Sequence, residues 1–206
     1  MSCHGSVIGV RESLVEPFIM LESVMSKLPT IHQISSVASS RLFHVEELHL
    51  EFSNGERRIY ERLANRGGGA VLIVPLLNDD TLLLVREYAA GTGRYELGFP
   101  KGKVERGENI VDAANRELME EVGFGAHHLQ LMRSVSLSPG YMAHHTNLLL
   151  ARDLYPHQME GDEPEPLEVV PWQLSDAAEL LQRDDFTEGR SLLALFLTLE
   201  WLKQHN

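Results

Sequence analysis

The alternation of apolar and polar residues near the start of the chain predicts a two-stranded β-hairpin. Residues 42–52 (LFHVEELHLEF) carry apolar side chains at alternating positions, which is the period of a half-buried strand. The turn after them contains Asn54-Gly55, the strongest short-range hairpin signal, and residues 57–63 return as the partner strand. Glycines at 67–69 then interrupt the chain, so we expect the hairpin to form a small module ahead of the main body.

A buried β-sheet is predicted in the main body. Residues 70–77 (AVLIVPLL) form a continuous apolar run, which favours a strand covered on both faces. A turn at 78–80 leads to a neighbouring strand at 81–88, and the stretches 133–138 and 146–154 indicate two more strands.

Three segments carry the signals of helices. Residues 109–122 contain no Gly or Pro, and Gly123 stands where a helix C-cap is expected. Ser175 is a suitable N-cap for a helix over 176–182, and residues 189–204 form a strongly apolar third helix. Successive helical residues turn by about 100°, so four apolar residues of the first helix share a face toward the sheet: Val111, Ala114, Leu118 and Val122. These elements predict an α/β fold.

The first 24 residues are expected to lie outside the fold. They have mixed composition and no clear period, whereas MSKLPTIHQI, from Met25, itself looks like the beginning of a protein. A short amphipathic helix around Pro17–Ser26 is the alternative. We therefore divide the 206 residues into an upstream extension (1–24), an N-terminal β module (25–66) and a main domain (67–206).

Composition limits the partners and the compartment. The net charge is −12 and no cluster of Lys or Arg stands out, which argues against a nucleic-acid surface. The single Cys3 fits a reducing compartment. No apolar run reaches the roughly 18 residues of a spanning helix, and the N-terminus lacks a signal-peptide pattern. We expect a cytoplasmic protein that binds neither membranes nor nucleic acid, and that can bind a small phosphorylated ligand through divalent cations.

Carboxylates are concentrated between Gly102 and Phe124. This segment holds five glutamates and Asp112. On the predicted helix Glu117 and Glu121 lie one turn apart, where like charges repel by about a few tenths of a kcal/mol. Crowded oxygen ligands beside a loop suit Mg²⁺, which shares them with substrate phosphates. A solvated acidic helix face is the alternative interpretation.

The spacing of these residues carries a family resemblance. Gly102 is followed after five residues by Glu108 and, after seven more, by residues 116–124 (RELMEEVGF). This pattern resembles the Nudix box at each defined position, including the apolar Leu118 and Phe124. The resemblance implies an α/β/α sandwich with a mixed sheet behind the small N-terminal β-hairpin module. It also implies metal-dependent hydrolysis of a nucleoside diphosphate linked to another group.

The resemblance implies roles for residues in and near the box. Three glutamates of Nudix hydrolases bind Mg²⁺, and the matching residues here are Glu117, Glu120 and Glu121. The Lys101 backbone carbonyl is implied as a further ligand, and Arg116 as the side chain that orients the carboxylates. Glu108 is expected either to anchor the loop or to join the metal shell. Mg²⁺, with Mn²⁺ as a substitute, would act as a Lewis acid and activate the attacking water.

Outside the box, residues 40–170 are similar to the ADP-ribose pyrophosphatase group, through YERLANRGGGAVLIVPLL, LLLVREY and SPGY. This similarity implies that Arg86 and Tyr88 contact the substrate, with a salt bridge as the alternative role of Arg86. Ala89 stands where the group has a second Arg, and Gly98 where it has a Glu. We therefore expect a broad use of ADP-linked compounds (ADP-ribose, NADH and diadenosine polyphosphates), with AMP as one product.

The acidic loop 160–166 (EGDEPEP) matches a loop that closes over the metals in the pyrophosphatase group. The match implies Glu163 as the general base and Glu165 as an extra metal ligand. A base beside cations needs no raised pKa, because it accepts a proton from an already acidified water. Glu120 is the next candidate for the base, and a solvated, proline-stiffened loop is the alternative interpretation.

The hairpin supplies two weaker candidates for substrate binding, Glu61 and Arg62. They reach the site only if the hairpin crosses to a partner, which is usual in the enzymes that the chain resembles and implies a homodimer. The alternative function is a catalytically idle nucleotide-binding regulator on the same fold. The complete set of box glutamates argues against that alternative, and the acidic balance disfavours RNA decapping.

Overall fold

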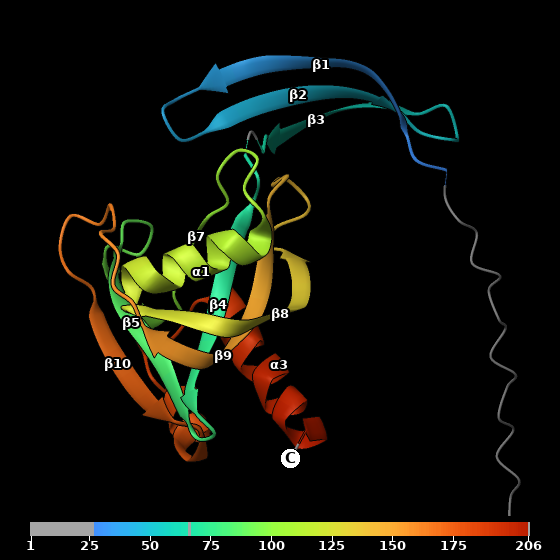
Figure 1. Ribbon diagram of the computed structural model, residues 1–206. Coiled ribbons are helices and arrows are strands. Elements are labelled where there is room, and N and C mark those ends of the chain that lie inside the picture. Colours follow the sequence, from blue (N-terminus) through green and yellow to red (C-terminus); the bar gives the residue numbers. More distant parts are fainter. Residues whose placement is uncertain (1–26, 66, 206) are drawn as a thin grey trace, which may run out of the picture.

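The computed structural model describes residues 27–65 and 67–205 and shows an N-terminal sheet and a larger main body (Figure 1). The N-terminal sheet is antiparallel with the order β1-β2-β3, formed by Thr30–Ser39, His44–Glu51 and Arg57–Leu63. The predicted hairpin, β2 and β3, is confirmed. β1 is absent from the prediction because almost all of its side chains are exposed and impose no pattern. The predicted extension, residues 1–24, lies outside the described residues.

A seven-stranded mixed sheet forms the main body. Its path is β10-β5-β4-β9-β8, with β6 beside β5 and β7 beside β4. The pairing of β4 with β9 is parallel, and the other strand pairings of this sheet are antiparallel. In chain order the strands are β4 (Ala70–Asn78), β5 (Thr81–Ala89), β6 (Arg94–Gly98), β7 (Lys101–Lys103), β8 (Phe124–Ser136), β9 (His145–Pro156) and β10 (Glu168–Gln173).

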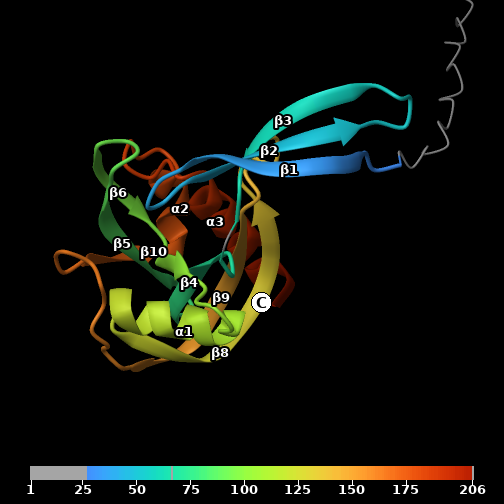
Figure 2. The same ribbon diagram turned by 90° about the horizontal axis from the view of Figure 1, so that it is seen from above.

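Helices cover both faces of this sheet (Figures 1 and 2). α1 (Ile110–Glu121) packs on the face of Val71 and Ile73, whereas α3 (Gly189–His205) packs on the face of Leu72 and Val74. This two-sided burial explains the continuous apolar run of β4. The predicted α/β sandwich behind a small N-terminal β module is confirmed.

The segment after β10 differs from the prediction. It forms a 3-10 turn, η1 (Leu174–Asp176), and then a short helix, α2 (Ala177–Leu180). Ser175 does not cap α2, because its hydroxyl donates to the Asp176 carboxylate at 2.9 Å. The predicted N-cap is therefore wrong. Among the described residues, no helix is long and apolar enough to cross a membrane.

Candidate active site

α1 turns two of its glutamates toward the sheet. Asn109 caps the helix by accepting a hydrogen bond from the Val111 amide at 2.8 Å, and Gly123, with a φ of 80°, follows its end. Glu117 and Glu121 are buried, each only 7% exposed. The buried face of α1 is thus rotated toward these carboxylates, and Val111, predicted on that face, is 39% exposed.

Gly102 of β7 allows one of these carboxylates to lie directly against the backbone. A Cβ atom on Gly102 would stand 2.0–2.2 Å from the carboxylate atoms of Glu117. No side chain fits there unless Glu117 moves. Glycine is therefore required at the first position of the motif for a steric reason, because the main chain of β7 lies in contact with the Glu117 carboxylate.

Arg116 links the glutamates of the motif. Its Nη1 donates to Glu117 at 2.7 Å and to Glu120 at 3.0 Å, and its Nε donates to Glu108 at 3.0 Å. Its Nη2 donates to the Lys103 carbonyl at 3.0 Å, so the guanidinium joins α1 to β7. Glu108 first, and then Glu117, raise the pKa of Arg116 and keep it charged. Arg116 thus makes the orienting contacts expected of it.

Glu108 anchors the loop between β7 and α1. Both of its oxygens accept hydrogen bonds from Arg116, and one also accepts the Glu105 backbone N–H at 2.9 Å. The bond from Arg116 is the main reason that the pKa of Glu108 is lowered. Of its two expected roles, these contacts match the loop anchor rather than the metal ligand.

Burial opposes the charge of the two inward-facing carboxylates. Desolvation raises the pKa of Glu121 to about 8 and also raises that of Glu117. Lys101 offsets part of this effect, since its backbone N–H donates to Glu121 at 3.1 Å while its ammonium pairs with Glu87 at 2.5 Å. Without a cation, the protein therefore disfavours the charged forms of these two carboxylates.

This set of donors suits a hard divalent cation, because a bound cation favours the charged form of buried carboxylates. Within residues 27–65 and 67–205, no three Asp, Glu, His or Cys side chains stand close enough to hold a metal ion as they are. Nη1 of Arg116 binds one oxygen of Glu117 and one oxygen of Glu120. The second oxygen of each carboxylate accepts no hydrogen bond from Arg116, so both glutamates keep an oxygen for a cation.

An acidic cavity of about 810 Å³ lies between α1, β7 and the acidic loop. Glu163 lines it from the loop, and its charge contributes to the raised pKa of Glu117. The chain just before the loop is fastened to α1, since the Met159 N–H donates to the Met119 carbonyl at 3.1 Å. The structure therefore brings Glu163 together with the box glutamates.

Glu165 does not line this cavity. Its carboxylate accepts a hydrogen bond from the Tyr95 hydroxyl at 2.5 Å. Tyr95 in turn lies edge-on to Tyr88, with ring centroids 5.6 Å apart. The metal-ligand role expected of Glu165 does not agree with this position.

A second, more apolar cavity of about 450 Å³ adjoins the acidic one. Tyr88 lines it together with residues of β6 and the start of α3. Glu87 and Lys101 line both cavities, so their ion pair stands between them. Tyr88 is expected from the sequence to bind the substrate. Glu87 is not predicted, because no pattern in the sequence distinguishes it from an ordinary charged strand residue.

Arg86 lines neither cavity. Its Nε donates to Glu168 at 2.8 Å and its Nη1 to Asp185 at 2.6 Å. As the neighbour of Glu87 in a strand, it faces the opposite side of the sheet. Of the two roles considered for Arg86, its contacts match a salt bridge, with partners far away in the sequence, and not a phosphate contact.

Glu61 and Arg62 of β3 lie away from the box glutamates within one chain. They line a separate cavity of about 370 Å³, which the N-terminal sheet shares with the loop around Tyr141. Arg62 also pairs with Glu46 at 3.0 Å. One chain therefore does not bring these two residues to the acidic cavity.

The carboxylate helix, its arginine and the mixed sheet together define a class of protein. The family described as the NUDIX domain matches residues 68–196, and the NudE-type Nudix hydrolase N-terminal domain matches residues 29–62. The chain belongs to the Nudix hydrolase family and is an enzyme of that class. The resemblance found in the box is confirmed.

Within this family, the chain is similar to hydrolases of ADP-linked compounds. The chain is 54% identical to the ADP compounds hydrolase NudE of Escherichia coli (strain K12), over 85% of this chain and 94% of that protein. It is 29% identical to the ADP-ribose pyrophosphatase of Bacillus subtilis (strain 168), over 74% of this chain and 81% of that protein. A crystal structure of an ADP compounds hydrolase matches with a TM-score of 0.83 and 51% identity, covering 88% of this chain and 97% of the other.

Proposed function

We propose that this Nudix hydrolase cleaves the pyrophosphate bond of ADP-linked compounds and releases AMP and a second phosphorylated product. ADP-ribose, NADH and diadenosine polyphosphates are the proposed substrates. The observation that carries the proposal is the acidic cavity, where the buried Glu117 and Glu121 meet Glu163. Similarity to an ADP compounds hydrolase and to an ADP-ribose pyrophosphatase supports the ADP moiety.

Magnesium is the proposed cofactor, with Mn²⁺ as a substitute. Glu117 and Glu121 are its strongest candidate ligands, because burial leaves their charge to be neutralised. Glu120 and the Lys101 carbonyl would complete the protein's share of the ligands. When bound, Mg²⁺ supplies Lewis acidity toward the phosphate oxygens and lowers the pKa of water.

Glu163 is the proposed general base. It lines the acidic cavity from a loop and is not held by Arg116, so its carboxylate is free to accept a proton as water attacks phosphorus. Glu120 is the second candidate, although Arg116 holds it at 3.0 Å. Arg116 acts by fixing the carboxylates of α1 in place.

The apolar cavity is the proposed site for the group on one side of the pyrophosphate. Tyr88, which is 53% exposed, offers it an aromatic ring. Ala89 and Gly98, the two departures from the ADP-ribose pyrophosphatase pattern, both line this cavity. Small residues at these two positions leave room and add no charge, which supports the use of several ADP-linked compounds.

The protein is further proposed to be a homodimer. Three large apolar side chains on one face of the N-terminal sheet are 49–50% exposed: Ile31, Ile34 and Tyr60, which lie opposite Leu50 or Leu48 of β2. An exposed apolar face of this kind suits a second copy of the chain. In such a dimer Glu61 and Arg62 would contact the substrate held by the other subunit.

A substrate panel tests the reaction. The protein is incubated with Mg²⁺ and ADP-ribose, NADH, diadenosine triphosphate or UDP-glucose, and the products are separated by anion-exchange chromatography. We expect AMP from each ADP-linked compound and little cleavage of UDP-glucose. Glu117→Gln, prepared in the same way, gives the background from contaminating enzymes. If no ADP-linked compound yields AMP above that background, the proposed reaction is wrong.

A further inference from the structure

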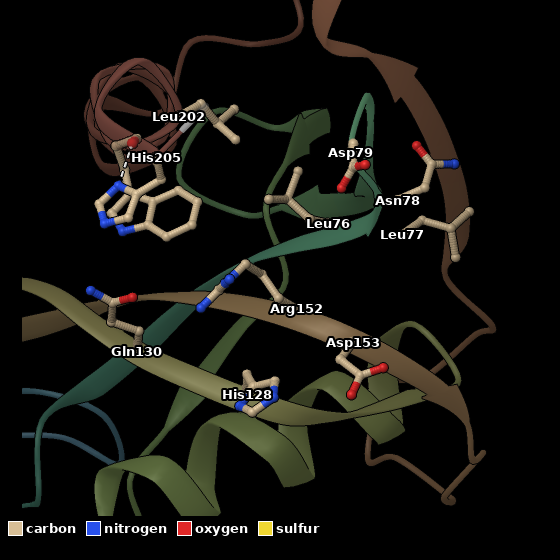
Figure 3. A pocket seen from close by; sticks show the side chains of 11 residues that line it. Leu76, Leu77, Asn78, Asp79, His128, Gln130, Arg152, Asp153, Leu202 and His205 are labelled. Carbon is tan, nitrogen blue, oxygen red and sulfur yellow. Dashed lines mark hydrogen bonds between the residues drawn. The ribbon is translucent and has the colours of Figure 1, made fainter.

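A fourth cavity, of about 610 Å³, lies between β8, β9, the turn after β4 and the end of α3 (Figure 3). Its lining shares no residue with the acidic cavity or with the apolar cavity beside it. Its volume is that of a site for a small molecule. The proposed reaction gives this cavity no role.

Arg152 stands in this cavity at a position where strand alternation places core residues. Leu148 and Leu150 precede it on the same face of β9, and both are fully buried in the core beneath α3. Arg152 continues that row, and its guanidinium lies 4.6 Å from the centre of the Trp201 ring. A cation at the end of an apolar row needs a specific reason.

Two buried donors of the cavity lack a hydrogen-bond acceptor among the residues that the structure describes. They are Nε of Arg152 and Nε1 of Trp201. Buried polar groups in native proteins are nearly always hydrogen-bonded, and a buried donor without an acceptor is unfavourable. Both side chains line the same cavity, so a single ligand could satisfy both donors.

Stacking on an indole does not by itself explain the missing acceptor. The chain has a second arginine over a tryptophan, Arg183, which lies 5.6 Å from the centre of the Trp172 ring. There the guanidinium is satisfied, since Nε and Nη2 donate to Asp185 at 2.7 and 2.8 Å. Nε of Arg152 has no such acceptor in the described part of the chain. The contrast points to an acceptor supplied by a ligand.

The two ends of the cavity differ in chemistry. Figure 3 shows the Arg152 guanidinium turned toward Gln130 and His205, whereas Asp79 and Asp153 lie on the other side. Donors gathered at one end suit an oxyanion, and carboxylates at the other end suit hydroxyl groups. Asp153 also has a φ of 56°, a strained backbone conformation of the kind that gathers at ligand sites.

We propose that this cavity binds a sugar monophosphate at a site separate from the catalytic centre. The phosphate accepts hydrogen bonds from Arg152 and from Nε1 of Trp201, and the sugar hydroxyls donate to Asp79 and Asp153. A nucleobase is a poor fit, because the Trp201 ring is already stacked on His205 with centroids 4.1 Å apart. A second phosphate would face the two carboxylates, so a monophosphate is favoured over a bisphosphate.

Trp201 provides the signal for a binding test. The chain has two tryptophans, so Trp172→Phe leaves Trp201 as the single indole fluorophore. Ribose 5-phosphate and inorganic phosphate are titrated separately in EDTA at constant ionic strength, which leaves no divalent cation to hold phosphate at the box glutamates. We expect a saturable change in emission with both, and binding of ribose 5-phosphate about tenfold tighter than that of phosphate. Trp201→Phe, which reports only on Trp172, should show no change.

Substitutions then locate the two halves of the ligand. In the Trp172→Phe background, Arg152→Gln should weaken both ligands about tenfold or more, whereas the matched Arg183→Gln should leave both unchanged. Asp79→Asn should weaken ribose 5-phosphate severalfold without weakening inorganic phosphate. Thermal melting by circular dichroism checks the fold of each variant. If Arg152→Gln does not fold, Arg152→Lys is used instead of that variant. Lysine keeps the positive charge but lacks the planar guanidinium that donates two parallel hydrogen bonds.

Three results would overturn the proposal. One is the lack of a saturable response to ribose 5-phosphate at millimolar concentrations, and another is an unchanged response in the folded Arg152 variant. Equal affinity for phosphate and ribose 5-phosphate would remove the sugar from the proposal. Because the titration contains neither Mg²⁺ nor an ADP-linked substrate, failure of the proposed reaction would not affect it.

Discussion

Burial decides the chemistry of Glu121. The side chain is 7% exposed, and desolvation raises its pKa to about 8 because the charged form loses water without gaining a full counter-charge. The Lys101 amide supplies one hydrogen bond, and the Lys101 ammonium is shared with Glu87. A divalent cation would reverse this preference for the neutral form. Glu121 therefore destabilises the protein in the absence of a cation, and a bound cation would remove that cost.

Glu121→Gln should lower the turnover number by about two orders of magnitude or more, because a charged ligand of the Lewis acid is lost. Without Mg²⁺ its melting temperature should equal or exceed that of the wild type, since the variant no longer has to bury an ionisable carboxyl group that must take up a proton on folding. Initial rates across a Mg²⁺ titration and differential scanning calorimetry measure both effects. Glu179→Gln, on the exposed side of α2, is the matched control. A near-normal rate of the Glu121 variant at saturating Mg²⁺ would remove Glu121 from the metal site.

Glu163→Gln should lower kcat far more than KM, because the base acts only as the proton leaves the water in the transition state. The Mg²⁺ concentration for half-maximal rate should stay close to that of the wild type. Glu165→Gln is the matched control from the same loop, since its carboxylate bonds to Tyr95 and lies outside the cavity. Steady-state kinetics with ADP-ribose make the comparison. If the Glu163 variant keeps most of its kcat, Glu120 becomes the candidate base.

The sequence predicts those helices and strands whose own residues show a run or a face of apolar side chains. β4, α1 and α3 each carry an apolar run or face, and all three are found close to the predicted residues. β7 has three residues, and β10 is largely exposed and contains Pro171, so neither has a local signal. They form because already buried strands, β4 and β5, offer them hydrogen bonds.

The same division holds for the candidate site. Motif spacing is enough to identify the carboxylates of α1 and Arg116, because one helix and one loop place them. The partners of Arg86 could not be predicted, since Glu168 and Asp185 are 82 and 99 residues away and meet it only in the folded sheet. The hydrogen bond between Glu165 and Tyr95 of β6 could not be predicted either, because these residues are 70 positions apart in the chain.

Asp185, in the loop before α3, should make the stability of the protein fall at acid pH. Its bonds from Arg183, and then from Arg86, hold the pKa of the Asp185 carboxyl below its ordinary value. An unfolded Asp has a pKa of about 3.9, so the stabilisation is fully present above that pH and is lost as the pH falls through the lower folded pKa. Asp185→Asn should therefore cost about 1.5–3 kcal/mol of unfolding free energy at pH 7.

This cost should shrink below about pH 4, because Asp185 of the unfolded wild type then takes up a proton while the folded form stays ionised. Urea unfolding at pH 7, 4 and 3 measures the difference between the wild type and the variant. Asp184→Asn is the matched control, because Asp184 is exposed and is one residue away. A difference that stays constant across the three pH values would contradict the assignment.

At the scale of the whole molecule, the N-terminal sheet has few contacts with the rest of its own chain. Its link to the main body includes a hydrogen bond from the Leu63 N–H to the Tyr141 carbonyl at 2.7 Å and one from the Ala143 N–H to the Leu63 carbonyl at 3.0 Å. Figure 2 shows the sheet projecting from the main body. A three-stranded sheet depends on its hydrophobic face for stability, and a second subunit would cover the exposed part of that face.

Sedimentation velocity at micromolar concentration should therefore give a dimer. Ile34→Lys places a charge in the exposed apolar face of β1 and should shift the protein to a monomer with a reduced rate, since Glu61 and Arg62 then reach no second substrate site. Leu131→Lys is the matched control, because Leu131 is similarly exposed (46% against 49%) but lies on β8. A wild-type monomer would remove both the dimer and the proposed role of the two hairpin residues.

Gly102 offers a way to recognise lost activity in a gene sequence. The atoms that an added methyl group would meet belong to the end of the flexible Glu117 side chain, so the chain would still fold while the carboxylate is pushed aside. A relative that keeps every glutamate but has alanine at this position should therefore be a well-folded protein with little hydrolysis. Surveys that count only the acidic residues would group such chains with the active enzymes, whereas this one methyl group separates them.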